Sequence, residues 1–307
     1  MIVIVGAGGF LGYSLSRYFS LAKVEFATIS RSFQWPRLLF EKRFVGNASN
    51  AISFLSAIDG DLTVLYMAGS PNLLLAEKDP FDDLSFHLNE LRGFLDIFSN
   101  QHCSSRKFIF FSSGGTVYGD SNGEAKSEDS ALIPKSSYGR RNVALEKLVV
   151  SFSRSSGFLF SIFRITNPFG PGQYRFRRRG LIQALVDSAY SGQKVLLRAN
   201  GLQKRDYIYS ELLCFMVNNI LQHNSIPEVV NIASGFSYTA REVISILEKN
   251  KFYPSFEYIN DSDSYEVIDS IVSSELVRSI VNLTPDDMYP FNASNLLSMS
   301  CFEDEET

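Results

Sequence analysis

The 307-residue chain has few cysteines and few histidines. Its three cysteines are odd in number and far apart, which fits neither a disulfide framework nor a zinc site: Cys103, Cys214 and Cys301. Its three histidines show no metal-ligand spacing and fall in predicted helices or directly after one, where we expect packing or surface roles: His87, His102 and His223. Sparse cysteines favour a reducing cytoplasm.

Long apolar runs are also missing. No stretch approaches the ~18 residues needed to span a bilayer. The N-terminal segment Met1 to Gly6 has no basic start and no small-residue cleavage site. We therefore expect it to be the first strand of a domain and not a signal peptide, in a cytoplasmic protein without membrane contact.

A strong charge imbalance is absent. The chain has 29 Lys and Arg against 33 Asp and Glu, a net charge of −4, so no global field attracts nucleic acid. With 45% hydrophobic and 20% charged residues, the composition is that of a globular protein. The length suggests one large domain or two small ones.

Short apolar runs alternate with helix-length segments over the first half of the chain. The predicted strands are residues 2–5, 24–30, 62–67, 107–112 and 159–164. The predicted helices between them are residues 10–21, 48–57, 81–101 and 136–154. This alternation predicts an α/β fold of the Rossmann type, a doubly wound parallel sheet with helices on both faces.

The pattern changes after Pro168. Residues 169–173 form a predicted loop, and predicted helices with short strands follow at 181–190, 210–223 and 239–250. We predict an NAD(P)-binding domain at residues 1–172, completed by about 203–235, a smaller C-terminal α/β substrate lobe at 173–202 and 236–300, and an acidic tail at 301–307.

A glycine-rich segment, GAGGFLG, follows the first predicted strand and opens a helix. Gly6 would allow the tight turn, Gly9 would let the backbone approach a pyrophosphate, and Gly12 would let helix and strand pack closely. The helix N-terminus offers N–H groups to phosphates. An ordinary strand-to-helix turn can also hold glycines, but the context on both sides favours a dinucleotide.

The second predicted strand ends Ile29-Ser30-Arg31-Ser32, without the acidic residue that would bind the ribose hydroxyls of NAD. Ser30 and Arg31 offer a hydroxyl and a cation that suit a 2′-phosphate, although a solvated surface arginine would look the same. We therefore favour NADP over NAD as the cofactor. Further cofactor contacts are expected at Phe10, Leu11, Asn47, Met67, Ala68, Gly69, Ser112 and Asn142.

Two polar segments follow. The fifth predicted strand ends SSGGTVYG at residues 112–119, at the strand edge that faces a ligand crevice. The segment SSYGRRN at residues 136–142 opens a helix. Tyr138 and Asn142 are four residues apart, so they share one helix face.

At these residues the chain resembles the extended short-chain dehydrogenase/reductases, specifically the NAD(P)-dependent nucleotide-sugar epimerase/dehydratase/reductase family. The resemblance runs from Met1 to about Pro285. Further similar segments follow in the expected order: RITNPFGPGQ at 164–173, RDYIY at 205–209, VNIASG at 230–235, and Asn89 on a long helix. Several motifs in order are more specific than one alone.

The resemblance implies that Tyr138 is the acid or base toward a sugar hydroxyl or keto group. The family's lysine, which holds the nicotinamide ribose, is Asn142 here. An ordinary tyrosine has a pKa of about 10, so losing a nearby cation leaves more of it protonated. A reductase tolerates this better than an enzyme that must first oxidise a hydroxyl. Arg141 could supply part of the missing field.

The resemblance also implies a serine or threonine that hydrogen-bonds the reacting oxygen. The usual position of this hydroxyl is Gly114 here, which leaves Ser113 and Thr116 as the candidates. Strand-end hydrogen bonding would explain Ser112 and Ser113 equally well.

On the substrate side, the resemblance implies that Asn167 and Arg205 contact a diphosphate, whose oxygens match the planar guanidinium. Arg205 could instead pair with its neighbour Asp206. A basic cluster suits either a solvated helix start or, through Arg179, a further diphosphate contact: Arg175, Arg177, Arg178 and Arg179. The net charge and the lack of a binding motif argue against nucleic acid.

These features predict an NADP-dependent reductase of a nucleotide-diphospho-4-keto-6-deoxyhexose. The resemblance places its product in bacterial surface polysaccharide, such as lipopolysaccharide, and implies a homodimer through the helices at 81–101 and 136–154. Two alternatives remain. One is a UDP-sugar 4-epimerase with tightly bound NAD. The other is a dinucleotide- or nucleotide-sugar-binding protein without catalysis, as Asn142 and Gly114 would suggest.

Overall fold

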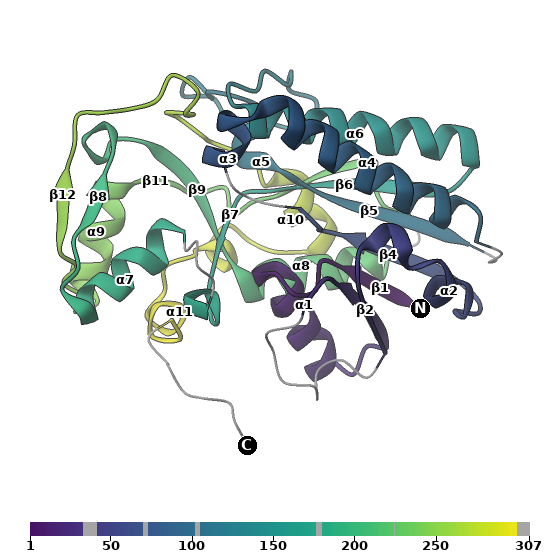
Figure 1. Ribbon diagram of the computed structural model, residues 1–307. Coiled ribbons are helices and arrows are strands. Elements are labelled where there is room, and N and C mark those ends of the chain that lie inside the picture. Colours follow the sequence, from purple (N-terminus) through teal and green to yellow (C-terminus); the bar gives the residue numbers. More distant parts are fainter. Residues whose placement is uncertain (33–41, 70–72, 102–104, 176–179, 224, 300–307) are drawn as a thin grey trace. The chain divides into compact units, whose positions relative to one another are not determined.

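The computed structural model describes residues 1–32, 42–69, 73–101, 105–175, 180–223 and 225–299 (Figure 1). The chain divides into two compact units: unit 1 contains residues 1–113, 136–163 and 224–230, and unit 2 contains residues 114–135, 164–223 and 231–307. The boundary at residue 172 stays a prediction, since it divides the chain by expected role. Some residues discussed above lie outside the described ranges: His102, Cys103, 177–179 and 301–307.

The main sheet confirms the predicted doubly wound fold. Within the described ranges its seven strands run in the order β10-β6-β5-β4-β1-β2-β3, and the printed pairings of β1 to β5 are parallel. The order moves outward from β1 to β3 and returns to β4, which puts the topological switch between β1 and β4. The bounds are β1 Ile2–Val5, β2 Phe26–Ser30, β3 Arg43–Val45, β4 Leu62–Tyr66, β5 Arg106–Ser113, β6 Leu159–Ile165 and β10 Val229–Ile232.

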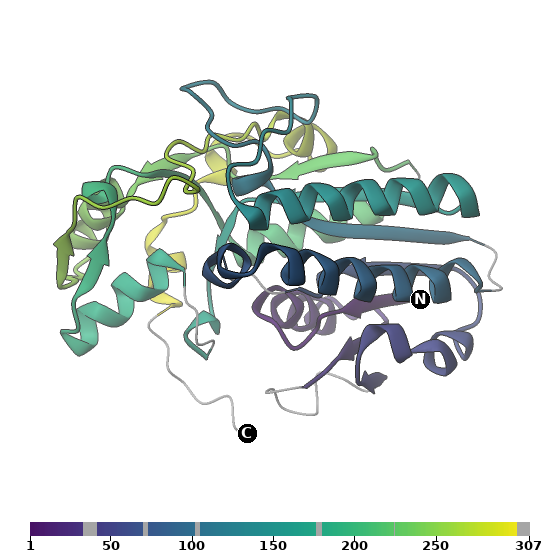
Figure 2. The ribbon, with the colours of Figure 1, turned by 45° about the horizontal axis from the view of Figure 1, so that its top comes forward.

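The core of unit 1 follows from the alternation of side chains along each strand. Val64 and Phe108 pack with Phe94 of α4 (Pro80–Ser99) in a cluster that also includes α6 (Ser137–Ser156). Figures 1 and 2 show α4 and α6 side by side on one face of the sheet, with α1 (Phe10–Leu21) on the other. Buried aromatic side chains thus contribute to packing the two long helices against the sheet.

Unit 2 contains, in its described part, a three-stranded sheet in the order β11-β9-β7 and the parallel pair β12-β8. Its helices α7, α8 and α9 begin and end close to the predicted positions. Thr239 and Glu242 form a reciprocal capping box at the start of α9. The bounds are β7 Asn167–Phe169, β8 Val195–Leu197, β9 Lys204–Tyr209, β11 Ser237–Thr239, β12 Phe256–Tyr258, α7 Leu181–Ser191, α8 Ser210–Leu221 and α9 Ala240–Lys249.

Short elements are where prediction and structure differ. The predicted helix at 48–57 is broken into a 3-10 turn, η2 (Ala48–Asn50), and α2 (Ile52–Ser56). α8 ends at Leu221, so His223 lies beyond the helix predicted to contain it. Phe169 ends β7 and is not part of the predicted loop. β3 and α3 (Leu73–Lys78) were not predicted, because such short elements show too few periods.

Two features limit the kinds of site in the described residues. Among them, no group of His, Cys, Asp and Glu side chains is arranged to hold a metal ion. Across the same ranges, each helix is too short or too polar to cross a membrane. Cys214 is buried in α8 and is not part of a disulfide.

Candidate cofactor and active site

The loop after β1 is packed so closely that side chains are excluded from it. Gly6 has φ +95°, and a Cβ there would lie 2.8 Å from the backbone nitrogen of Ala68. A Cβ on Gly12 would lie 2.5 Å from the Cα of Ala7. Gly8, which the sequence pattern did not single out, is equally constrained, because its Cβ would lie 2.5 Å from the Ser30 hydroxyl.

Gly9 is constrained differently. The nearest atom to a Cβ on Gly9 would be the Gly6 carbonyl oxygen at 3.5 Å, so the protein itself leaves this space open. Gly9 precedes α1 without a side-chain cap, and the first N–H groups of a helix have no acceptor within it. An open backbone beside uncapped N–H groups fits a pyrophosphate, which Gly9, Phe10 and Leu11 would hold.

The end of β2 is fastened to this loop. The Ser30 hydroxyl donates to the Ser32 carbonyl oxygen at 2.8 Å and accepts from the Gly8 N–H at 3.2 Å. Arg31 is exposed beside it. After β4, the Met67 N–H donates to the Val5 carbonyl oxygen at 2.9 Å. The structure thus brings together the glycine loop, the end of β2 and the segment after β4, which were predicted separately.

Two further predicted cofactor residues, Gly69 and Asn47, are exposed. Gly69 is exposed after β4, and a Cβ there would meet no atom within 4 Å. Asn47 is exposed and precedes η2, where its carbonyl oxygen accepts from the Asn50 N–H at 3.0 Å. Their contacts with a cofactor stay predictions.

The first turn of α6, which carries Tyr138, is anchored by hydroxyl and carboxylate groups. The Ser136 side chain accepts from the Gly139 N–H at 3.0 Å, as an N-cap residue does. The Glu77 carboxylate on α3 accepts from both the N–H and, at 3.0 Å, the hydroxyl of Ser137. A carboxylate at a helix N-terminus is favourable, so α3 helps to fix the turn on which the predicted acid sits.

Asn142 is turned back onto its own helix. Its side chain is buried, and Nδ2 donates to the Tyr138 backbone carbonyl at 2.9 Å. One turn further, the buried Glu146 carboxylate accepts from the Ser112 hydroxyl. The Ser112 hydroxyl, predicted to face the cofactor, is therefore engaged within unit 1, and Ser113 ends β5. Glu146 was missed in the sequence because nothing in its neighbourhood marked it as buried.

A buried ion pair lies against the Tyr138 ring. Arg141 is 4% exposed, and its Nη1 donates to both oxygens of Asp83 at 2.9 Å. Its guanidinium carbon is 4.6 Å from the centroid of the Tyr138 ring. His87 Nε2 lies 3.6 Å from the Asp83 carboxylate, but burial lowers the pKa of His87 to about 4, so it is neutral at pH 7. Asp83 lies 58 residues before Arg141 in the chain, and no local pattern predicts a pairing over that distance.

In unit 2, Gly114 and Thr116 belong to α5 (Gly114–Val117). A Cβ on Gly114 would lie 2.9 Å from the Arg164 carbonyl oxygen and 3.4 Å from the Thr166 methyl group. The backbone contact leaves no room for a side chain at the position where the resemblance implies a hydroxyl. The Thr116 hydroxyl is buried and has no hydrogen-bond partner among the described residues.

We predict that Gly114→Ser fails to restore a catalytic hydroxyl. The added side chain must displace the β6 backbone, so the free energy of unfolding should fall by about 1–3 kcal/mol. Urea unfolding would measure the loss. Gly115→Ser is the matched control, because a Cβ there meets its nearest neighbour only at 3.4 Å. Equal stability of the two variants would contradict the prediction.

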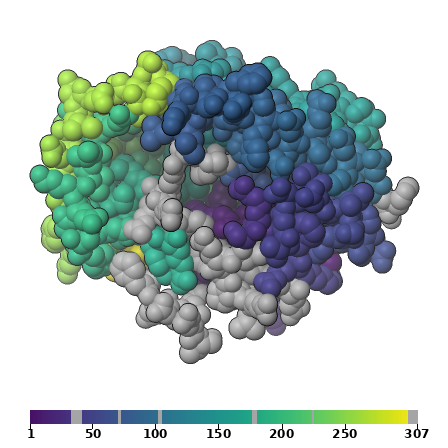
Figure 3. All heavy atoms as spheres, in the orientation of Figure 1, coloured from purple at the N-terminus to yellow at the C-terminus, as the bar shows by residue number. Residues whose placement is uncertain are grey.

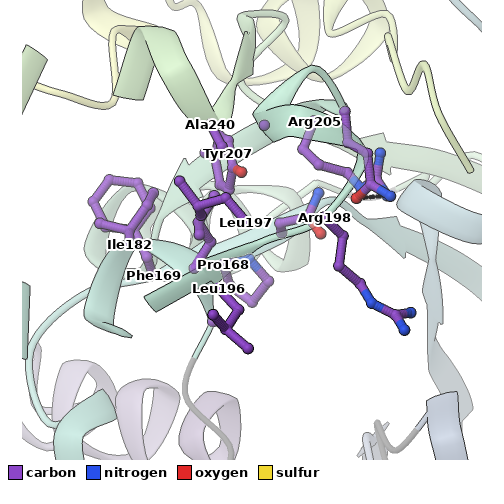
Figure 4. A pocket seen from close by; sticks show the side chains of 14 residues that line it. Pro168, Phe169, Ile182, Leu196, Leu197, Arg198, Arg205, Tyr207 and Ala240 are labelled. Atoms are coloured by element: carbon purple, nitrogen blue, oxygen red, sulfur yellow. Dashed lines mark hydrogen bonds between the residues drawn. The ribbon is translucent and has the colours of Figure 1, made fainter. Parts of the chain in front are cut away.

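Unit 2 contains a pocket of about 290 Å³. Its walls include apolar residues, among them Phe169, Ile182 and Leu197, together with the cations Arg198 and Arg205. Figure 4 shows these apolar side chains gathered apart from Arg205. Asn167 also lines the pocket, and its Nδ2 donates to the Asp206 carbonyl oxygen on the paired strand β9 at 2.7 Å. The two predicted substrate residues therefore share one cavity.

Arg205 does not pair with Asp206. Neighbours on a strand point to opposite faces, and Asp206 is fully buried against Thr166 and Ser234. Arg205 instead donates to Gln203 Oε1 at 3.3 Å and to the Lys204 carbonyl at 2.9 Å, and burial lowers the pKa of its guanidinium. A partly buried cation held in a cavity suits a phosphate group.

Arg198 was missed in the sequence. It lines the same pocket and pairs with Asp263, with Asp261 at 3.2 Å and with Glu266 at 3.4 Å. Its hydrogen bond to Asp263 is the main cause that raises the pKa of its guanidinium. Of the predicted basic cluster, Arg175 donates to the Tyr174 hydroxyl at 2.9 Å, and Arg179 lies outside the described residues.

Three of the sequence motifs meet at one tyrosine of unit 2. The Tyr118 hydroxyl accepts from Arg164 at 2.9 Å and donates to Asn231 Oδ1 at 2.7 Å. Each of these residues belongs to a different segment that the resemblance identified. Tyr118 and Asn231 are 113 positions apart in the chain. Their meeting in one buried cluster supports the order of motifs seen in the sequence.

Comparison with protein families matches residues 2–233 to the NAD dependent epimerase/dehydratase family. This span includes the glycine loop, Tyr138 and Arg205. The chain belongs to this family. Family membership accounts for the shared motifs.

Relatives of this family member include both reductases and epimerases. The chain is 35% identical over 144 residues to the dTDP-4-dehydro-6-deoxyglucose reductase of Escherichia coli, which covers 46% of this chain and 45% of that protein. It is 29% identical over 142 residues to a putative UDP-glucose 4-epimerase of Methanocaldococcus jannaschii, with 46% of each chain covered. The chain thus matches about half the length of these curated relatives.

Solved structures share the fold of this family member over nearly its full length. The UDP-glucose 4-epimerase of Thermus thermophilus, in complex with NAD, has a TM-score of 0.84 at 18% identity and covers 98% of this chain and 99% of its own. An NAD-dependent NDP-hexosamine 5,6-dehydratase of tunicamycin biosynthesis has a TM-score of 0.83 at 21% identity. The match covers 100% of this chain and 99% of that protein. At such identities the likeness concerns the fold.

Proposed function

We propose that this protein is an NADP-dependent reductase of a nucleotide-diphospho-4-keto-6-deoxyhexose. The observation that carries the proposal is the end of β2, where an exposed Arg31 stands without an acidic neighbour in Ile29-Ser30-Arg31-Ser32. A cation there suits a 2′-phosphate, and a reduced NADP cofactor suits net reduction. The reductase from Escherichia coli among the relatives supports the same reaction class.

Within this proposal, the residues of each unit have separate tasks. Gly9, Phe10 and Leu11 hold the pyrophosphate of the cofactor, and Arg31 holds its 2′-phosphate. When bound, the reduced cofactor supplies a hydride for the keto carbon. Tyr138 donates its hydroxyl proton to the carbonyl oxygen of the sugar. Asn167 and Arg205 bind the diphosphate, and the apolar side of their pocket receives the nucleoside.

Absorbance of the reduced nicotinamide during incubation with 4-keto-6-deoxy sugar nucleotides tests the proposal. Consumption of NADPH, faster than that of NADH, is the expected result. No consumption across a panel of dTDP-, UDP- and GDP-linked keto sugars would overturn it. Binding of the sugar nucleotide without turnover would then favour a non-catalytic binding protein.

A UDP-sugar 4-epimerase with tightly bound NAD is the second candidate, because epimerases occur among both the relatives and the fold neighbours. It predicts that the protein purifies with NAD bound and interconverts UDP-sugars without net loss of reduced cofactor. Chromatography of the nucleotide released on denaturation separates the two candidates, since the reductase should release little.

We predict that Arg31→Ala shifts cofactor preference. Losing a charge-assisted contact to the 2′-phosphate should raise the KM for NADPH about 10-fold, and the KM for NADH should stay within about twofold, since NADH lacks that group. Steady-state kinetics with both cofactors measures the change. A parallel rise in both values would show that Arg31 supports the loop and does not read the phosphate.

We also propose that the protein is a homodimer in which α4 and α6 face the second copy. Figure 3 shows the residues of α3 and α4, in blue, at the surface of unit 1. Exposed apolar side chains gather there: Leu74, Leu75, Phe81 and Phe86. Sedimentation at micromolar concentration should give twice the mass of the chain. A monomer at that concentration would contradict the proposal.

A further inference from the structure

A cation on α6 itself lies against the Tyr138 ring. The amide of Asn142 carries no charge and is bonded to the helix backbone. Arg141, one residue earlier, is a buried cation whose guanidinium lies 4.6 Å from the ring centroid. A cation at this distance from an aromatic face is attracted by the ring, and more strongly where water is excluded.

The position of this cation is fixed by a second element. Nη1 of Arg141 donates to both carboxylate oxygens of Asp83 at 2.9 Å, and the side chains are 4% and 14% exposed. Asp83 lies in the first turn of α4, whose N-cap is Asp79. Because α4 and α6 pack along their lengths, the pair holds the guanidinium over Tyr138 without needing a ligand.

We propose that Arg141 is a positioning residue for Tyr138. Its guanidinium fixes the tyrosine ring and stabilises the negative charge that forms when the hydroxyl proton moves to the substrate oxygen. Asp83 holds this cation and offsets part of its field. The inference rests on the proposed function, in which Tyr138 is the proton donor. It adds that Arg141 supplies the positive charge beside the tyrosine that the neutral Asn142 does not.

Other ionisable groups near the tyrosine do not compete for this role. His87 is neutral at pH 7, because burial lowers its pKa to about 4. The Glu77 carboxylate is engaged by Ser137, and Arg140 donates to the Ser137 hydroxyl at 2.6 Å. Within the described ranges, the ionisable groups that contact this turn or its ion pair include Glu77 from α3, Asp83 and His87 from α4, and Arg140 and Arg141 from α6 itself.

The pH profile of kcat distinguishes an electrostatic role from a purely structural one. In Arg141→Met, kcat should fall about 10-fold, and the alkaline limb of the profile should move to higher pH. In Asp83→Asn, the limb should move down, because the cation is no longer offset. Arg140→Met removes the same charge from the neighbouring residue and should change neither kcat nor the position of the alkaline limb. Identical profiles for Arg140→Met and Arg141→Met would overturn the inference.

A double-mutant cycle gives a second, independent test. If Arg141 does the work of a lysine, then Asn142→Lys should raise kcat at least fivefold in the Arg141→Met background and less than about twofold in the wild type. Equal factors in both backgrounds would show that the residues act independently and would overturn the inference. Because Arg141→Met leaves Asp83 unpaired, Arg141→Met combined with Asp83→Leu provides a variant without a buried lone charge.

Failure of the proposed function can be told apart from failure of this inference. If the wild type consumes no NADPH, an ultraviolet difference titration between each protein and its Tyr138→Phe counterpart still follows ionisation of this one tyrosine. With Arg141 present, the titration curve should lie at lower pH than in Arg141→Met. Superimposable titrations would overturn the inference even where turnover cannot be measured.

Discussion

Tyr138→Phe is expected to lower kcat for reduction of the nucleotide-linked keto sugar by about 10³-fold. The change removes one hydroxyl and keeps the ring that packs under Arg141. Without the proton donor, negative charge on the substrate oxygen is left uncompensated as hydride arrives. The KM for NADPH should change less than about threefold, because the phosphate-binding residues lie on other elements.

Stopped-flow absorbance under single-turnover conditions measures this step apart from product release. Tyr190→Phe is the matched control, because Tyr190 is 58% exposed at the end of α7 and lies in unit 2. Retention of more than a third of the wild-type rate by Tyr138→Phe would exclude this tyrosine as the donor. The epimerase and reductase proposals would both lose their proton-transfer group.

Asp206→Asn is expected to have the second large effect, on stability. The Asp206 carboxylate is fully buried and accepts from the Thr166 hydroxyl at 2.7 Å, the Ser234 N–H at 3.1 Å and the Gly235 N–H at 2.8 Å. Asparagine keeps the size but turns one acceptor into a donor facing other donors. The free energy of unfolding should therefore fall by about 3 kcal/mol, as urea unfolding would show.

The effect of Asp206→Asn should also depend on pH. Burial raises the pKa of the Asp206 carboxyl to about 7, whereas in the unfolded chain it is about 4. Between these values the folded state binds more protons, so the stability contributed by this group is complete below about pH 4 and is lost as the pH rises through about 7. The difference between wild type and variant should be larger at pH 5 than at pH 8.

Asp261→Asn is the control for this measurement, because its side chain is 64% exposed and belongs to the same unit. Comparing the two variants cancels the titration of other carboxylates. A difference between wild type and Asp206→Asn that stays constant from pH 5 to 8 would contradict the raised pKa and would show that the carboxylate is ionised throughout this range.

The parts of the fold that could be predicted from the sequence are the elements in which apolar residues recur with a regular period. Five strands and the helix at 10–21 were recognisable because apolar residues recur with a regular period. The glycine loop was recognisable because its composition reflects backbone geometry, and the structure places Gly6 at φ +95°. Elements of three to six residues, such as β3 and α3, carry too few positions for any period to show.

The site was predictable only as far as motifs extend. Asn167 and Arg205 were expected near one ligand, and they line one pocket. Arg198 in the same pocket was missed, because its role depends on carboxylates more than 60 residues away. Asp83 was missed for a similar reason. Pairings over such distances leave no local trace, and neither does the close backbone contact that requires glycine at position 114.

The hydroxyl of Ser30 links cofactor preference to the geometry of the glycine loop, two properties that coenzyme engineering usually treats as separate. Converting the proposed preference for NADP to one for NAD would call for an acidic residue at the end of β2. Ser30 bridges the Gly8 N–H and the Ser32 carbonyl oxygen, and a carboxylate can accept from the first but cannot donate to the second. Ser30→Asp would therefore place its carboxylate against the Ser32 carbonyl oxygen, which is also an acceptor, and loosen the glycine loop. Placing the acidic residue at position 31 leaves that bridge intact.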